Sequence, residues 1–488
     1  MLSICLIATR CVRVWGGASI RERAAIALND QSFSGPFPEC WLQRARWQLT
    51  LPIRFRVGCL ARKAASGILP FTEVQPSESQ ASSAMSSTSA TDLSPELVEV
   101  IRQAVNPQRL IDTAIHLIDA PSPTCNAGVV ADRLAHLLAE DSFTVERPVA
   151  DWPEAPAVVV RYETGKPGRT LQFDGHLDTV HLPFVPPRVE DGILYGSGAS
   201  DMKGGIAAFV ETLRVLRETA TLPGGAILLT AHDHHEGPWG DRRQVHAFLR
   251  DGIVGDAVLL PEYLADRLPL AGRGMAIFEV SITRTGDPVH EVLRPPGQPD
   301  VVKTGAELVV RLHQLHDRLK TIRLPHAGHD SAFVGKFHAG EIYNQSPTLC
   351  TLAGTRRWVT PGSGAAVRAE FEQLLADLAQ ETGTEISANY ELQGEAFRID
   401  PAHPVVHAFQ GAYTAISGSP LPLGAKPFVD DGNTYAGLGG IPAITHGPDA
   451  KGAHTLNEAV PVAELVRVAQ VYALTAIGFC GGGAETRE

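Results

Sequence analysis

The stretch Thr170–Asp178, TLQFDGHLD, is an apolar run that closes on a histidine and an aspartate. A short apolar run of this kind, bounded by turn residues, is typical of a buried β-strand. The segment Gly204–Ala220 then shows helical spacing of its apolar residues, and a second apolar run follows in Gly224–Asp233. Strands that alternate with helices indicate a mostly parallel sheet, because parallel neighbours need a crossover connection. The pattern therefore predicts an α/β fold with helices flanking a central sheet.

The alternation stops near Gly274, where a different order of elements begins. Strand, helix, strand, strand, helix and strand follow in turn as far as Phe397, which is the split βαβ order of ferredoxin-like α+β domains. Helix, strand and a long C-terminal helix then restore the α/β pattern, so a smaller domain is expected to be inserted in a larger one. We divide the chain into an N-terminal extension (1–94), the first part of the large domain (95–275), the inserted domain (276–395) and the second part of the large domain (396–485).

The N-terminal extension differs from the rest of the chain in composition. Its first 84 residues carry a net positive charge, whereas the whole chain has a formal net charge of -12. A Ser-rich linker that contains Met85 follows, and we expect the extension to be poorly ordered. Two interpretations stay open. The segment is an organelle-targeting or other leader, or translation starts at Met85 and the upstream part does not belong to the natural protein.

Charge and cysteine usage argue against several classes of protein. The net negative charge is unsuited to a nucleic-acid binder that relies on phosphate contacts. The seven cysteines include no C-x-x-C pair and are too few for a disulfide scaffold. The apolar start of the chain, MLSICLIA, is too short to cross a bilayer. We expect a cytoplasmic protein with no nucleic-acid or membrane partner.

Acidic and histidine side chains gather where the predicted strands end, and ligands of open α/β sheets bind at that edge. Taken singly, such residues are more often loop hydrogen-bonding groups or helix N-caps. Together they predict a two-metal site, because two metals need several carboxylates and imidazoles, one of them bridging. The residues are His176 and Asp178 of FDGHLD, Asp201 of GSGASDMKGG, the cluster HDHHE at 232–236, Glu262 of VLLPE and His454 of GAHTLNE.

The segments GHLDTV, DGILYGSGASDMKGGIAA, HHE, PE and GAHTLNE occur in this order. They resemble the co-catalytic metallopeptidase family that includes glutamate carboxypeptidase, acetylornithine deacetylase and succinyl-diaminopimelate desuccinylase. The resemblance covers roughly residues 95–485, and GHLDTV and GSGASDMKGG are its most specific parts. It implies an α/β catalytic domain with an inserted lid and dimerisation domain, hence a homodimer. It also implies two divalent metal ions, with zinc expected first and cobalt or manganese as alternatives.

The resemblance also assigns roles to the residues at the strand ends. His176 and Glu262 would ligate the first metal, His454 would ligate the second, and Asp201 would bridge both. Asp178 would orient His176 through the second nitrogen of its ring, a common arrangement around metal-bound histidines.

Three residues of the inserted domain resemble the family's substrate and oxyanion contacts: His290, Asn344 and Arg357. Donors of this kind stabilise charge that develops on a scissile carbonyl. Arg357 could instead bind a substrate carboxylate with both of its terminal nitrogens. A surface salt bridge is the third interpretation, and the neighbouring Arg356 leaves the choice open.

The HDHHE cluster departs from the family, whose members carry two adjacent glutamates there: a general base, then a ligand of the second metal. In one alignment Glu236 is the ligand and His235 stands at the base position. In the other, His235 is the ligand and His234 stands at the base position. We prefer the first alignment, because the interval from Asp201 to Glu236 is close to the family's usual spacing.

A histidine base changes the electrostatics of the reaction. It becomes positive on taking a proton, and at about 4 Å this costs roughly 4 kcal/mol per unit of cation charge at an effective dielectric near 20. Our first hypothesis is a slowed or unusual metal-dependent amidohydrolase that acts on a small peptide, N-acyl amino acid or carbamoyl compound bearing a carboxylate. The second is a catalytically impaired relative that contains metal and acts in binding or interaction. The missing Glu-Glu pair favours the second hypothesis, and the five ligand positions favour the first.

The stretch Pro427–Gly440, PFVDDGNTYAGLGG, leads to the strand that precedes His454. Its polar residues Asp430, Asp431 and Asn433 either contact substrate or build a Gly-rich turn. We favour the turn.

Overall fold

The computed structural model describes residues 93–237 and 240–482, and the predicted extension and leader therefore lie almost wholly outside the described residues. A six-stranded sheet forms the centre of the large domain, in the order β1-β2-β6-β3-β7-β19. The pairs β3–β6, β3–β7 and β7–β19 are parallel, whereas β2 runs antiparallel to both β1 and β6. The strands are β1 (Val145–Glu146), β2 (Val158–Glu163), β3 (Thr170–His176), β6 (Ala226–His232), β7 (Ala257–Leu260) and β19 (Ala443–Thr445). The mostly parallel sheet predicted from TLQFDGHLD is confirmed.

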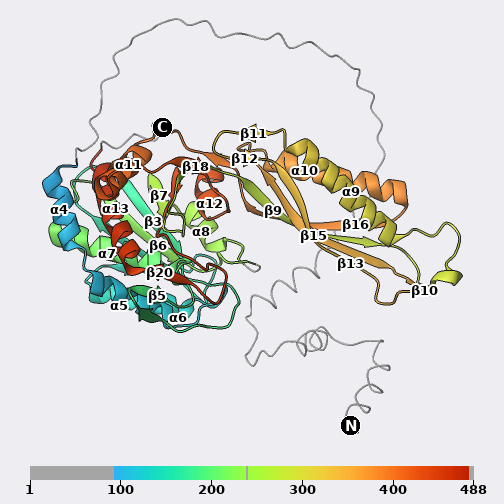
Figure 1. The fold of residues 1–488 in the computed structure, drawn as a ribbon, viewed down its shortest axis with the longest axis horizontal. Helices are drawn as coiled ribbons and strands as arrows, with labels where there is room; N and C mark the ends of the chain where they lie inside the picture. Colours follow the sequence, from blue (N-terminus) through green and yellow to red (C-terminus); the bar gives the residue numbers. More distant parts are fainter. Residues whose placement is uncertain (1–92, 238–239, 483–488) are drawn as a thin grey trace, which may run out of the picture. The chain divides into compact units, whose positions relative to one another are not determined.

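Helices cover both faces of this sheet (Figure 1). One face packs against the helices that share the largest buried apolar cluster, and the other packs against α8 and α12 through a smaller cluster around Leu260 and Tyr435. The first group comprises α4 (Pro95–Ala104), α5 (Pro107–Ile118), α6 (Gly128–Glu140), α7 (Lys203–Thr219), α11 (Pro404–Ser417) and α13 (Val462–Cys480). The second comprises α8 (Arg243–Asp251) and α12 (Gly432–Gly437).

The helix α13 is long and apolar enough to cross a membrane by length and composition, the single such helix in the described part of the chain. Its residues are mostly buried, because it packs against α11 and α7. Those contacts make α13 the central helix of one layer in this fold.

The segment from Gly274 to Gly394 builds a second, four-stranded antiparallel sheet in the order β13-β15-β9-β16, with two helices packed on it. The elements follow one another as β9 (Gly274–Thr283), α9 (Val301–Leu319), β13 (Ser331–Ala339), β15 (Leu349–Trp358), α10 (Gly364–Thr382) and β16 (Glu385–Gly394). This is the predicted βαββαβ order. Its core contains Phe278, Leu312 and Phe371.

Smaller sheets complete the two parts. In the order in which they pair, they are β20 (Ala459–Pro461), β5 (Ile193–Tyr195) and β4 (Arg188–Glu190); β17 (Phe397–Arg398), β8 (Leu268–Gly272) and β18 (Leu423–Ala425); β10 (Val289–His290) and β14 (Gln345–Ser346); and β11 (Arg323–Leu324) and β12 (Gly328–His329). The 3₁₀ helix η1 spans Glu291–Leu293.

Candidate metal centre and active site

The site lies at the carboxyl edge of the central sheet, where the chain leaves β3, β6 and β7. The parallel register pairs His176, the last residue of β3, with His232, the last residue of β6. Glu262 follows the end of β7, and Asp201 stands just before α7. The topology thus brings residues from distant parts of the sequence to one edge, as the rule for parallel sheets requires.

Asp201 lies between two histidines. One carboxylate oxygen, Oδ1, is 3.2 Å from Nε2 of His176, and the other, Oδ2, is 3.2 Å from Nε2 of His454. The same nitrogen of His454 is 3.2 Å from Oε2 of Glu236. A carboxylate that presents a different oxygen to each of two imidazoles is suited to bridging two metal ions. Glu236 and His454 share one side of this bridge, and His176 lies on the other.

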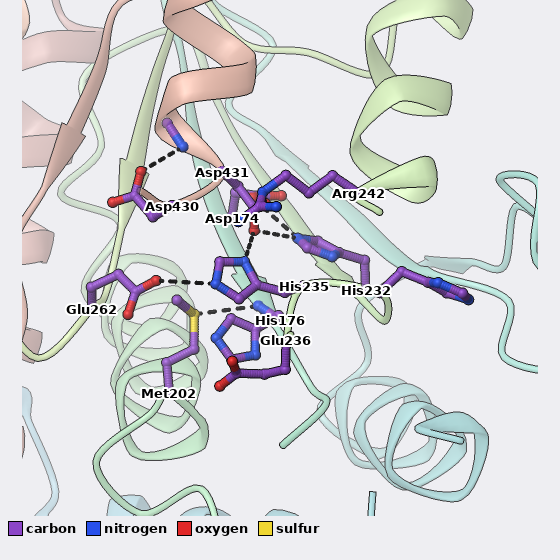
Figure 2. Close-up of polar contacts among 12 residues, drawn as sticks. Asp174, His176, Met202, His232, His235, Glu236, Arg242, Glu262, Asp430 and Asp431 are labelled. Atoms are coloured by element: carbon purple, nitrogen blue, oxygen red, sulfur yellow. Dashed lines mark hydrogen bonds and ion pairs between the residues drawn. The ribbon is translucent and has the colours of Figure 1, made fainter. Parts of the chain in front are cut away.

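Glu262 completes the side of His176. One atom from each of His176, His235 and Glu262 lies within 4.8 Å of the others, and the same holds for His176, Asp201 and Glu236. Figure 2 shows Glu262 beside the ring of His235 and Glu236 beside that of His176. The five predicted ligands therefore form one continuous group of donors.

The charge of this group fits divalent metals. Asp201, Glu236 and Glu262 are buried. Burial raises the pKa of Glu262 well above its ordinary value, and the negative charge of Asp201 adds to the effect. Hydrogen bonds to Asp201 and Glu236 raise the pKa of His454 to about 10. So much negative charge away from water is costly unless cations compensate it, and carboxylates with imidazoles are the donors that zinc and similar ions bind.

Asp178 contacts the second ring nitrogen of His176, and it does so through its main chain. Nδ1 of His176 donates to the main-chain carbonyl of Asp178 at 2.9 Å, whereas the carboxylate is 3.6 Å away. That carboxylate instead accepts hydrogen bonds from the main-chain nitrogens of His235, at 3.1 Å, and Glu236, at 2.8 Å. Asp178 therefore holds the ring of His176 with its carbonyl and anchors the turn after β6 with its side chain.

The residues of the HDHHE cluster lie in different surroundings. His234 is buried against the ring of Trp152, with ring centroids 4.5 Å apart, and its Nδ1 is 3.4 Å from Asp241. His235 faces the site, since its Nε2 is 3.8 Å from Oε1 of Glu262. Glu236 joins Asp201 and His454 as described above. This arrangement is the one required by the alignment in which Glu236 is a ligand and His235 stands at the base position.

The rings of His176 and His235 are stacked, with centroids 4.0 Å apart and an angle of 8° between their planes. A zinc–imidazole bond lies in the ring plane and is about 2.0–2.1 Å long. A metal in the plane of one ring is therefore well outside the plane of the other. One ion therefore could not bind a nitrogen of each ring in this arrangement, so if His176 held a metal, His235 would not be a ligand of the same ion.

The description "Peptidase family M20/M25/M40" belongs to the family model that this chain matches over residues 173–477, more than half of its length. The chain belongs to this family. As an M20 peptidase relative it is a metal-dependent hydrolase of amide C–N bonds, and its substrate is a small molecule.

The M20 match agrees with individual relatives. The chain is 28% identical over 380 residues to succinyl-diaminopimelate desuccinylase of Cereibacter sphaeroides, covering 73% of this chain and 95% of the relative. Its fold is similar to that of aminopeptidase PepT from Bacillus cereus, with a TM-score of 0.65, 20% identity and coverage of 77% and 99% of the two chains. It is also similar to the Bacillus subtilis YXEP protein, a dinuclear metal binding peptidase from the M20 family, with a TM-score of 0.57, 15% identity and coverage of 76% and 97%.

The three residues of the inserted unit that resemble M20 substrate contacts do not meet in one place. Asn344 and His290 lie together, with Nδ2 and Nε2 3.0 Å apart; His290 is exposed and Asn344 is half-buried. His290 follows the end of β9 at Thr283, and Asn344 precedes β15, whose first residue, Leu349, pairs with Thr283. Arg357 instead pairs with Met275, near the start of β9. A strand of ten residues spans about 30 Å. Arg357 is therefore far from His290 and Asn344 of the same chain, and the substrate contacts that the resemblance implies stay a prediction.

Glu458, the last residue of GAHTLNE, has a positioning role in this M20 chain that its sequence context did not reveal. Its buried carboxylate accepts hydrogen bonds from the main-chain nitrogens of Gly198, Ser200 and Asp201 and from the hydroxyl of Ser200, at 3.0–3.1 Å. These bonds tie the loop that carries the bridging Asp201 to the loop that carries His454. The nearness of Glu458 to His454 in sequence was the available signal.

The polar residues of the segment VDDGN differ in what they contact. Asp430 pairs with Lys426 and Thr445, and Asn433 donates to the carbonyls of Arg273 and Glu395, so these two build the turn as expected. Asp431 does more: its Oδ2 is 2.7 Å from Nδ1 of His235. Asp431 therefore contacts a site residue in addition to its place in the turn.

Proposed function

We propose that this M20 enzyme hydrolyses the amide bond of a small peptide, N-acyl amino acid or carbamoyl compound that carries a carboxylate, with two zinc ions. The observation that carries the proposal is the placement of Asp201 between His176 and His454, with Glu262 and Glu236 beside them. Similarity along 95% of a desuccinylase, whose name describes removal of a succinyl group from an amino acid, supports an acylated or peptidic substrate.

The ligands divide into two sets that share one residue. His176, Asp201 and Glu262 would hold the first ion, and Asp201, Glu236 and His454 would hold the second. Such ions lower the pKa of bound water to about 7 and polarise a carbonyl. A mixture of imidazole and carboxylate donors with no thiolate is compatible with zinc, cobalt or manganese, and zinc is the first choice for this geometry.

His235 would act as the general base. Its Nδ1 is engaged by Asp431, so Nε2 is the nitrogen left to take a proton. That nitrogen lies 3.8 Å from Oε1 of Glu262, and its ring is stacked on that of His176, so it faces the ligand group from which an attacking water would come. Because a protonated imidazole beside two cations is unfavourable, we expect turnover slower than with a glutamate base.

Arg357 would bind the substrate carboxylate. Burial, together with the neighbouring charge of Arg273, lowers the pKa of Arg357 to about 10. Its Nη1 is buried and has no hydrogen-bond partner among the described residues. A half-buried guanidinium with an unpaired nitrogen gains from a carboxylate that binds it with two hydrogen bonds. His290 and Asn344 would contact substrate only if a second chain brings them to a site.

The inserted unit would form a homodimer. Its strand β13 lies at the edge of the sheet, and Phe333 and Phe337 on it are 64% and 45% exposed. Val302 and Val310 of α9 are exposed as well. An edge strand with exposed aromatic residues is a surface that pairs with another chain. A cytoplasmic location, expected from cysteine usage, is part of the same proposal and is tested by fractionation of cells.

The test uses the full chain, purified and reconstituted with Zn²⁺, Co²⁺ or Mn²⁺. Metal content is measured first, and the loaded protein is then offered a panel of dipeptides, N-acyl amino acids and carbamoyl amino acids. Turnover of a carboxylate-bearing member, lost on chelation and restored by metal, supports the proposal. Bound metal with no turnover of any compound would contradict it and favour the alternative of a metal-containing binding protein, which the missing Glu-Glu pair suggests.

A further inference from the structure

Asp431 lies behind His235 as seen from the ligand group (Figure 2). It is fully buried and stands immediately before α12, far in sequence from the turn after β6. Its Oδ2 is 2.7 Å from Nδ1 of His235 and 3.4 Å from Nε2 of His232, and its Oδ1 is 3.4 Å from Nε of Arg242. One carboxylate thus faces two imidazoles and a guanidinium.

The hydrogen bond decides which nitrogen of His235 carries the hydrogen. An ionised carboxylate only accepts, so Nδ1 must be the protonated nitrogen of the neutral ring. The lone pair is then on Nε2, which is directed toward Glu262. The same bond fixes the ring in the orientation that stacks it on His176. Arg242 offsets the charge of the buried carboxylate and so favours the ionised, accepting form.

We propose that Asp431 is a positioning residue for the reaction: it fixes the tautomer of His235 and aims Nε2 at the attacking water. This inference rests on the proposed function. In the step it serves, the water oxygen bonds to the amide carbon while a water proton passes to Nε2 of His235. The C–N bond then breaks, and that proton leaves Nε2 for the departing nitrogen. Asp431 keeps its charge throughout and stabilises the protonated ring, which compensates part of the cost of a histidine base.

A purely structural role is the competing explanation, because Asp431 also faces His232. Asp174 provides the matched control. Its Oδ2 is 3.4 Å from the same Nε2 of His232, and it is equally buried, bonded to Thr230 and Tyr435. Asp174→Asn therefore removes a carboxylate partner of His232 and leaves the bond to His235 in place.

The first arm of the test is kinetic, on the full metal-loaded chain. Asp431→Asn presents an amide that can donate to Nδ1 and reverse the tautomer. We expect kcat to fall by about 10²- to 10⁴-fold, with KM and metal content nearly unchanged. Asp174→Asn should lower the Tm and leave kcat within about threefold of wild type. In a His235→Ala background, Asp431→Asn should have no further effect on kcat, because its target is gone.

The second arm does not depend on activity. In protein labelled with ¹⁵N-histidine and free of metal, the Nδ1 hydrogen of His235 should give a downfield resonance, assigned by its loss in His235→Ala. It should disappear in Asp431→Asn and persist in Asp174→Asn. Equal losses of kcat in Asp431→Asn and Asp174→Asn, or a hydrogen on Nε2 of His235 in the wild type, would overturn the proposal. If no compound is turned over at all, the proposed function fails, and the resonance alone still decides the role of Asp431.

Discussion

The carboxyl edge of the central sheet and the sheet of the inserted unit place their polar residues in opposite ways. At the edge, His176, Asp201 and Glu262 are buried and lie against other site residues. On the inserted unit, His290 is exposed and Asn344 half-buried, and Arg357 lies at the opposite end of β9.

The difference shows which parts of the site one chain completes. Parallel strands end at one edge by construction, so residues at those ends converge without further help. An antiparallel sheet separates residues along its strands, so its polar groups need another surface to form a site. We therefore expect variants at the sheet edge to abolish chemistry, and variants on the inserted unit to alter recognition and assembly.

The largest effect is expected at the bridge. Asp201→Ala removes a ligand from both metal positions. Metal content should fall and kcat should drop by at least about 10³-fold, since a single oxyanion donor is already worth about 10²–10³. Metal analysis and kinetics measure this. Asp430→Asn, equally buried but outside the ligand group, is the control and should retain metal. If the Asp201→Ala variant retained both ions, Asp201 would not be a bridging ligand.

The next effect concerns the base. His235→Ala should keep its metal and lower kcat by about 10²- to 10⁴-fold, the usual contribution of general base catalysis. Wild-type kcat in this variant would mean that His235 is not the base.

Replacement of His235 by glutamate tests the same base position in a second way. His235→Glu places two carboxylates side by side, because Asp431 faces this position. His235→Glu with Asp431→Asn should therefore be several-fold more active than His235→Glu alone. A double variant slower than the single one would contradict the pairing of residues 235 and 431.

A smaller effect is expected at Arg357, and it should appear in binding. Arg357→Met should raise KM for a carboxylate-bearing substrate by about 10- to 100-fold, the equivalent of roughly 1.5–3 kcal/mol for a hydrogen bond to a charged group. The methyl ester of the same substrate serves as the control. An equal loss with acid and ester would show that Arg357 does not bind the carboxylate.

The smallest effect on the chemistry itself is expected from the edge strand. Phe333→Asp with Phe337→Asp should convert the proposed dimer to a monomer, because like charges would then face the partner strand. Light scattering after gel filtration measures the mass. The ligand group should still bind metal in the monomer. A wild-type monomer at micromolar concentration, or a double variant that remains dimeric, would exclude this surface as the interface.

Much of the fold was predictable because local patterns and tertiary structure agree. The apolar run before His176 is buried in β3, and the βαββαβ order near Gly274 has its own core. The nearness of the candidate ligands to one another was predictable for the same reason, since His176 ends β3, Glu262 follows β7, and Asp201 and His454 lie in loops at the same edge. The residues that contact these candidate ligands and His235 were not predictable from the sequence. Asp431 reaches His235 only through packing of α12 on the sheet, and no local pattern encodes that contact.

The sequence also could not indicate which atom of Asp178 contacts His176. Carbonyl and carboxylate of Asp178 are both close to His176, and only the path of the turn after β3 decides which one accepts the hydrogen bond. The separation of His290 from Arg357 follows from strand register, which spacing in the sequence did not specify.

Metal stoichiometry in His235→Ala tests the central claim most directly. We propose that His235 is a base and not a ligand, because its ring is stacked on that of His176, and that His176, Asp201, Glu236, Glu262 and His454 would hold both ions. After reconstitution with zinc, the account predicts two ions per chain in the wild type and two in His235→Ala, with turnover lost only in the variant. One ion or none in the wild type, or the loss of an ion from His235→Ala, would contradict it.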